Sequence, residues 1–287
     1  MSLKSKQSEV THLTQEQVRQ FSTFGYTIVP GFFNAREVAA LQADVERLKT
    51  LGKLRNVATD GDGKTHSTQK ANLQICPMYP ESKLIRALPF EPKVVEAVSG
   101  LIGERVVLHL DQCFLKPARN GAGTNWHQDN AYFKIPDPLR GTAMWIAVHD
   151  ATVANGTMRI IPGKVREKYE HSRDPQSDHH IRCYPPEDEA VVCEVAAGGA
   201  IFFAYGTPHC TRGNTTDKDR AGVAFHFLDE QYAGPARDQA GKEGWGGRPV
   251  LSGPNYSGGL KEYGEAVAGT WEQEIAKLLN EPACVLS

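Results

Sequence analysis

The run RVVLHLDQCFL at residues 105–115 marks a change in hydrophobic period, from helical spacing before it to strand-like spacing after it. Further short apolar runs follow, separated by Gly, Pro and Asn. Many short strands without helical patterns between them favour antiparallel sheets over an open parallel sheet. We therefore predict a mainly β fold with flanking helices, whose core at about residues 105–228 is a double-stranded β-helix (jelly roll, cupin-like). The other predicted strands lie at residues 143–149, 157–161, 190–196, 200–205 and 221–228.

Signals for helix starts dominate the N-terminal third. Thr14 with Gln17, and Asn34 with Glu37, have the spacing of a capping box, in which two side chains three residues apart bond each other's backbone N–H. We predict a helical part at about residues 12–103 that packs on one sheet. The apolar stripe expected behind the second box is Val38, Leu41, Val45 and Leu48.

Three polar or glycine-rich stretches interrupt the regular pattern, at residues 52–70, 166–190 and 232–264, and the last contains nine glycines. Loops of this length in a compact domain are usually lids, binding loops or disordered segments. We expect the first two to form a lid. A glycine-rich segment and a helix starting at Thr270, which with Gln273 has the spacing of a third capping box, should make up residues 232–287. We predict a single domain over residues 1–287.

Composition limits the classes of function. With 40% hydrophobic and 23% charged residues the chain should fold as a globule. Its 32 basic and 34 acidic residues lack the positive excess that binding to nucleic acid phosphates requires. No apolar run approaches the roughly 18 residues of a membrane span. We expect no nucleic acid or membrane partner, a cytoplasmic location, and a small-molecule substrate.

Two His-x-Asp pairs are candidate metal chelators. His127 and Asp129 follow a glycine-rich turn and fall on the same side of an extended segment. Chance alone supplies about half such a pair in a chain of this size, so the motif is weak by itself. The second pair, His109 and Asp111, lies in a strand whose other face is apolar apart from Gln112. We expect His109 and Asp111 to face outward as an ordinary polar surface.

His209 is the best candidate for a third ligand, because it directly follows an apolar strand at residues 200–205. Two histidines and one carboxylate form the facial triad of non-haem Fe(II) oxygenases, although zinc binds the same ligands. Arg220 opens a strand beside the small residues Gly222 and Ala224, an arrangement that suits a carboxylate ligand, and Thr211 adds a hydroxyl. A surface salt bridge is the ordinary alternative for Arg220.

The combined spacing of these motifs resembles the phytanoyl-CoA dioxygenase family of Fe(II)- and 2-oxoglutarate-dependent oxygenases. The likeness covers most of the chain and is most specific between residues 105 and 228. The residues that carry it are Trp126-His127-Gln128-Asp129, Tyr132-Phe133, Trp145, Asn155-Gly156-Thr157-Met158, Ile161-Pro162-Gly163, Pro208-His209 and Arg220.

By this resemblance, His127, Asp129 and His209 correspond to the iron ligands, and Arg220 with Thr211 to the clamp on the distal carboxylate of 2-oxoglutarate. Trp145 and Gln112 match positions that line the co-substrate, and Asn72 and Gln74 are expected to approach from the preceding extended segment.

The resemblance implies a hydroxylase that uses Fe(II), 2-oxoglutarate and O₂ to act on an aliphatic C–H bond of a small organic metabolite, releasing succinate and CO₂. Asp129 stands where related halogenases have a small residue, which favours hydroxylation. Lys164-Val165 stands where the family often has Ser-His.

Two alternatives stay open. One is a zinc-dependent hydrolase or isomerase on a jelly roll. The other is a non-enzymatic sugar-binding jelly roll in which Trp126, Tyr132 and Trp245 stack on the ligand.

Overall fold

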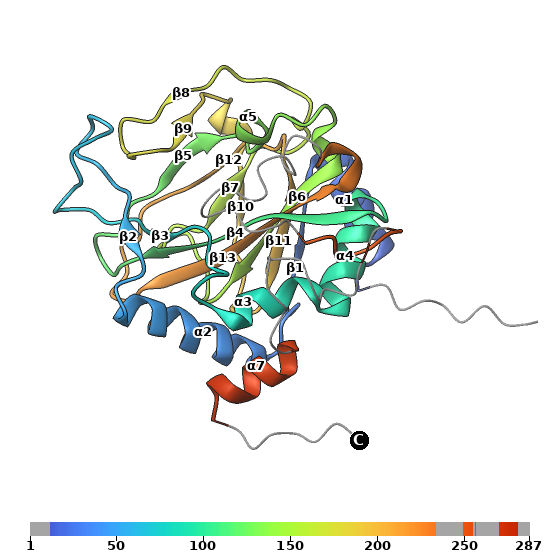
Figure 1. The fold of residues 1–287 in the computed structure, drawn as a ribbon. Helices are drawn as coiled ribbons and strands as arrows, with labels where there is room; N and C mark the ends of the chain where they lie inside the picture. The colour runs from blue at the N-terminus through green and yellow to red at the C-terminus, as the bar shows by residue number, and fades with distance from the viewer. Residues whose placement is uncertain (1–11, 234–248, 255, 257–269, 281–287) are drawn as a thin grey trace, which may run out of the picture.

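The computed structural model describes residues 12–233, 249–254, 256 and 270–280. Two antiparallel sheets face each other, and a two-stranded ribbon of β8 (Ser172–Arg173) and β9 (Ile181–Arg182) lies beside the smaller one (Figure 1). In order across the larger sheet the strands are β1 (Tyr26–Val29), β11 (Ala200–Ala204), β6 (Gly141–Ala147), β13 (Arg220–Asp229), β4 (Val106–Lys116), β3 (Leu73–Ile75) and β2 (Arg55–Asn56). In the smaller sheet they are β10 (Val191–Cys193), β7 (Met158–Ile160), β12 (His209–Thr211) and β5 (Thr124–His127).

Helices cover the outer face of the larger sheet (Figure 1). The three predicted capping boxes form at Thr14, Asn34 and Thr270, and both side-chain hydrogen bonds are present in each. The α-helices are α1 (Gln15–Phe24), α2 (Ala35–Thr50), α3 (Lys83–Ala87), α4 (Pro92–Ile102), α5 (Asn130–Phe133) and α7 (Trp271–Leu278). The 3₁₀ helices are η1 (Leu88–Phe90), η2 (Pro138–Arg140), η3 (Glu187–Glu189) and η4 (Glu230–Tyr232). None of the helices in the described ranges is long and apolar enough to cross a bilayer.

Strand β6 shows how the two layers of core are built. Its side chains alternate, because successive residues of a strand point to opposite faces. Met144 and Ile146 pack with the helices, whereas Ala143, Trp145 and Ala147 face the smaller sheet. Both faces of the central sheet are thus buried, which explains why β6 reads as a continuous apolar run.

Strand β4 departs from the predicted alternation. Its pairing with β13 shifts register, so that His226 lies opposite Leu110 and Phe227 opposite Leu108, leaving His109 as an extra residue. A bulge of this kind reverses the faces on its two sides. Hence Leu108 packs with the helices whereas Leu110 turns toward the space between the sheets.

The expectation that His109 faces outward is therefore wrong, whereas Asp111 does lie on the outer face of the sheet, on the same side as Cys113 and Leu115. Asp111 is buried and accepts hydrogen bonds from the backbone N–H groups of Met78 (2.6 Å) and Tyr79 (3.0 Å). Burial raises the pKa of Asp111 to about 6. His109 lines the cavity between the sheets.

The two stretches expected to form a lid are tied to each other. Backbone hydrogen bonds run from Thr59 N to Gln176 O (3.0 Å) and from Gly63 N to Pro175 O (2.8 Å). A role as a lid stays a prediction. Most of residues 232–264, including Trp245, lies outside the described residues.

Candidate active site

Strands β5 and β12 bring the first two candidate ligands together. His127 and His209 are direct cross-strand partners, and their ring centroids are 4.2 Å apart. Asp129 follows β5 and is 5% exposed. One nitrogen or oxygen atom from each of the three lies within 4.8 Å of the other two. The structure thus gathers residues that are 82 positions apart in sequence into a single cluster.

Hydrogen bonds orient both imidazoles. Nδ1 of His127 donates to the carbonyl of Asn125 (2.9 Å), and Nδ1 of His209 donates to that of Thr207 (3.0 Å), because a carbonyl oxygen can only accept. The Nε2 atoms, at 3.7 and 3.8 Å from Asp129 Oδ1, carry the free lone pairs.

Burial keeps these two histidines neutral. It lowers the pKa of both His127 and His209 to about 4, and in His127 the neighbouring His209 adds to the effect. Two neutral imidazole nitrogens and one carboxylate oxygen, with the second ring nitrogens already fixed, are a donor set that fits a divalent transition metal.

Gln128 anchors the segment between two ligands. Its side chain points away from the cavity, as the alternation of an extended segment requires. Its Nε2 donates to the carbonyls of Gly206 (2.5 Å) and Glu167 (2.7 Å). These bonds hold His127 and Asp129 in place from behind.

A cavity of about 580 Å³ lies between the sheets. We call the part lined by the buried Arg220 and Lys116 its closed end, and the part lined by the exposed Arg55 and His179 its open end. Every residue of the predicted site lines the cavity except Asn72, which donates a hydrogen bond to Oγ1 of the lining residue Thr124 (3.3 Å). The predicted residues in the lining are Gln74, Gln112, His127, Asp129, Trp145, His209, Thr211 and Arg220.

The closed end of the cavity holds two buried cations, Arg220 and Lys116. They are opposite each other on β13 and β4, and both are 1% exposed. Arg220 donates to the carbonyls of Asn155 (3.4 Å) and Gly156, and Lys116 Nζ donates to those of Gly156 (3.2 Å) and Arg212. The described part of the chain offers neither of them a carboxylate.

Burial shifts both cations toward their neutral forms. It lowers the pKa of Arg220 to about 10, so this group stays charged at neutral pH. Burial, and next the charge of Arg220, lower the pKa of Lys116 well below its usual value. Because a buried charge is costly without a counter-charge, this end of the cavity suits an anionic ligand.

Thr211 and Trp145 complete the closed end. Thr211 Oγ1 accepts the Thr124 N–H (3.1 Å), so its own hydroxyl proton is available to a ligand. Trp145 lies flat against β13, where a Cβ on Gly222 would come within 2.2 Å of Trp145 Cζ2. The Arg220 guanidinium carbon is 5.5 Å from the Trp145 ring centroid. The sequence pattern of Arg220 followed by small residues thus has a direct structural reason.

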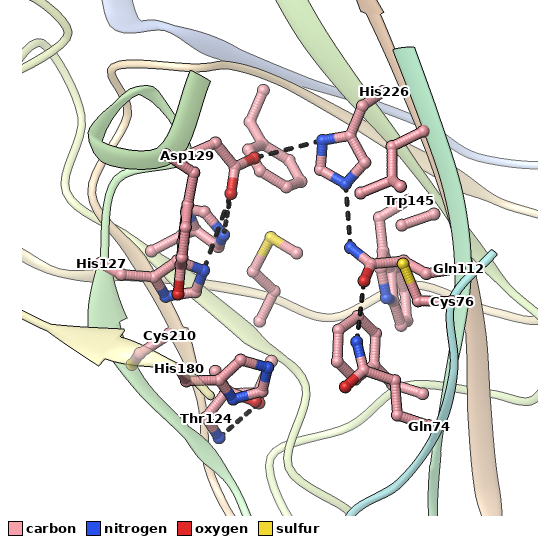
Figure 2. A pocket seen from close by; sticks show the side chains of 18 of the residues that line it. Gln74, Cys76, Gln112, Thr124, His127, Asp129, Trp145, His180, Cys210 and His226 are labelled. Atoms are coloured by element: carbon pink, nitrogen blue, oxygen red, sulfur yellow. Dashed lines mark hydrogen bonds and ion pairs between the residues drawn. The ribbon is translucent and has the colours of Figure 1, made fainter. Parts of the chain in front are cut away.

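Sequence reasoning missed two residues of the site, Lys116 and His226. Figure 2 shows His226 between Asp129 and Gln112, and Gln112 in turn bonded to Gln74. Extending the alternate positions of β13 from Arg220 by three steps would have reached His226. In the same way, two further steps along β4 from the predicted Gln112 would have reached Lys116.

The open end of the cavity is built differently. Asp178 accepts hydrogen bonds from Arg55, from His179 Nδ1 (2.6 Å) and from His66 Nε2 (3.1 Å). Despite partial burial, the bonds from Arg55 and His179 lower the pKa of Asp178 to about 2. The charged and polar side chains at this end are thus hydrogen-bonded to Asp178.

Trp126 does not face the cavity. It is 4% exposed and packs in a separate small core cluster with Cys183 and Cys210. This removes one of the stacking surfaces that a sugar-binding site would need.

Comparison with known proteins places the chain among oxygenases. The sequence model of the family described as phytanoyl-CoA dioxygenase (PhyH) matches residues 21–222. An ectoine dioxygenase of Bordetella parapertussis is 23% identical over 230 residues, which cover 74% of this chain and 74% of the relative.

Solved structures show the shared fold. EctD from S. alaskensis, solved with 2-oxoglutarate and 5-hydroxyectoine, has a TM-score of 0.62 at 20% identity and covers 78% of this chain and 79% of its own. The non-heme α-ketoglutarate-dependent epimerase SnoN from nogalamycin biosynthesis has a TM-score of 0.61 at 22% identity, covering 75% and 82%. The predicted mainly β, jelly-roll fold is confirmed.

Proposed function

Because the chain belongs to the phytanoyl-CoA dioxygenase family, as its motifs predict, we propose that it hydroxylates an aliphatic C–H bond of a small organic metabolite, with Fe(II), 2-oxoglutarate and O₂, releasing succinate and CO₂. One observation carries this proposal. A His-Asp-His cluster and a buried arginine without a carboxylate partner line the same cavity.

His127, Asp129 and His209 would hold Fe(II). Bound there, Fe(II) would supply the activation of O₂ and the oxidative decarboxylation of 2-oxoglutarate that lead to oxidation of the substrate. The neutral imidazoles are ready to bind metal without first losing a proton.

The other residues of the closed end bind and orient the co-substrate. Arg220 pairs with the distal carboxylate through its fixed fork of donors, and the Thr211 hydroxyl donates to the same group. Trp145 forms a flat apolar wall, and Gln112 with Gln74 forms a polar one. Their burial excludes water and strengthens each of these contacts.

A zinc hydrolase is the weaker alternative. Such an enzyme needs a general base near the metal. Among the described residues lining the cavity, the one carboxylate, Asp129, belongs to the His-Asp-His cluster, so only a histidine such as His226 or the amine of Lys116 is left for this role. A hydrolase also leaves Arg220 without a role.

The test is succinate release by metal-free protein reloaded with Fe(II) and supplied with 2-oxoglutarate and O₂. A panel of small metabolites, including ectoine, should contain compounds that raise the rate and yield a product heavier by one oxygen atom. His209→Ala should abolish succinate release, whereas His66→Ala, outside the cavity lining, should not. Protein that retains zinc and releases no succinate with Fe(II) would contradict the proposal.

A further inference from the structure

His226 lies directly behind Asp129, the carboxylate of the His-Asp-His cluster. It is 3% exposed, and its Nδ1 is 3.5 Å from Asp129 Oδ2 (Figure 2). The other carboxylate oxygen, Oδ1, faces His127 and His209. Neither Oδ2 nor His226 Nδ1 has a hydrogen-bond partner among the described residues, and the contact between them is at ion-pair distance. Asp129 Oδ2 and His226 Nδ1 are thus two buried polar atoms that lie close together and lack a hydrogen-bond partner in the described part of the chain.

The amides beyond His226 fix which of its nitrogens carries the proton. Gln74 Nε2 donates to Gln112 Oε1 (2.9 Å), so the other end of the Gln112 amide, Nε2, points at His226 Nε2 (3.0 Å) and donates to it. His226 Nε2 is then an acceptor, and the proton of the neutral ring must be on Nδ1. The proton therefore faces Asp129 Oδ2.

We infer that His226 is a positioning residue for the metal-binding carboxylate: its Nδ1–H holds Asp129 Oδ2 so that only Oδ1 is presented to the metal. This inference rests on the proposed metal site. A carboxylate held in this way binds through one oxygen, which leaves three adjacent positions on the metal for 2-oxoglutarate and O₂. Partners of metal ligands orient them and tune their affinity.

Two substitutions of His226 separate this role from general packing. In His226→Asn, the amide nitrogen occupies the place of Nδ1 and still reaches Asp129. In His226→Gln, the amide occupies the place of Nε2 and reaches Gln112 instead. Loss of a partner of this kind typically weakens metal binding by about 10- to 100-fold. We expect that loss in His226→Gln and less than about a threefold loss in His226→Asn.

The experiment is anaerobic titration of metal-free full-length protein with Fe(II), and with Co(II), whose absorption spectrum reports coordination geometry. Neither 2-oxoglutarate nor substrate is present, so the readout is independent of activity. The Co(II) spectrum should change in His226→Gln and keep the wild-type form in His226→Asn. Equal affinities and spectra in wild type and both variants would overturn the role of His226 while leaving the metal site intact. Wild-type protein that binds neither metal would overturn the site itself.

A further variant keeps the inference testable if substitutions of His226 prevent folding. Gln112→Leu removes the donor that fixes the ring of His226 but leaves the ring in place. It should weaken Fe(II) binding about three- to tenfold, and unchanged binding would contradict the proposed chain of contacts.

Discussion

The two ends of the cavity use arginine in opposite ways. At the closed end, Arg220 is 1% exposed and donates only to carbonyl oxygens. At the open end, the Arg55 side chain is 57% exposed and already bonded to Asp178, which also accepts from two histidines. The closed end is electrostatically incomplete without an anion, whereas the open end is complete by itself.

This difference indicates which end of the cavity specifies its ligand more strongly. Burying a cation costs desolvation free energy, which a neighbouring anion can offset. The closed end therefore strongly favours an anionic ligand. Exposed ion pairs contribute little and are easily replaced. On the proposed function, the buried charge of Arg220 therefore serves the co-substrate, and we expect the substrate to be selected at the open end.

The largest effect should come from Arg220→Gln, which breaks the closed end. Removing one member of a buried charge pair costs about 2–5 kcal/mol, so affinity for 2-oxoglutarate should fall by at least about 30-fold. Anaerobic calorimetry of the Fe(II)-loaded protein measures it. Fe(II) affinity should be unchanged, and a parallel loss of Fe(II) would show that the variant damages the fold.

Gly222→Ala should act on the same end through packing. Its new Cβ would lie 2.2 Å from Trp145 Cζ2 and displace the ring into the cavity. Overpacking typically costs about 1–3 kcal/mol, so we expect about tenfold weaker 2-oxoglutarate binding. Gly100→Ala, in helix α4 with open space around the new Cβ, is the matched control and should leave binding unchanged.

Thr211→Val tests the hydroxyl with little change in shape. One hydrogen bond contributes about 0.5–1.5 kcal/mol, which predicts a loss of about fivefold in affinity for 2-oxoglutarate. Thr211→Ser keeps the hydroxyl and should stay close to wild type. If both variants bind equally well in the same titration, Thr211 is not part of the clamp.

The pH dependence of Fe(II) binding probes the middle of the cavity. Protonation competes with the metal, and burial lowers the pKa of His127 and His209 from 6.5 to about 4. Affinity should then change less than about twofold between pH 7 and pH 5.5 and fall steeply only as the pH approaches 4. Two histidines of ordinary pKa would already lose more than about tenfold by pH 5.5. Anaerobic titrations at fixed ionic strength decide between the two.

Arg55→Gln should have the smallest effect, because it breaks an exposed ion pair. Affinity for 2-oxoglutarate should change less than about twofold and stability by less than about 1 kcal/mol. Calorimetry and thermal unfolding measure these. A loss as large as that of Arg220→Gln would erase the distinction between the two ends.

Much of the fold was predictable because the signals are local. Each capping box needs only four consecutive residues, and all three form where the sequence placed them. The strands of the core likewise follow from short apolar runs. The bulge at His109 was not predictable, since it arises from pairing with β13, more than a hundred residues later.

The site was predictable where residue type and spacing point to one chemistry. His127, Asp129, His209 and Arg220 combine into a recognisable set. Lys116 lies two steps along β4 from Gln112, but a lysine at a strand end matches no ligand pattern. In the proposed role His226 contacts Asp129 and not the metal, so it belongs to no metal-ligand motif that could be found in the sequence.

The most direct test of the central claim is anaerobic addition of Fe(II) and then 2-oxoglutarate to the metal-free wild-type protein, followed by visible absorption. Chelation of the keto acid to the iron should produce a weak charge-transfer band that requires both additions and saturates at one equivalent of iron per chain. Iron binding without such a band at saturating 2-oxoglutarate would contradict the assignment of the closed end as the co-substrate site.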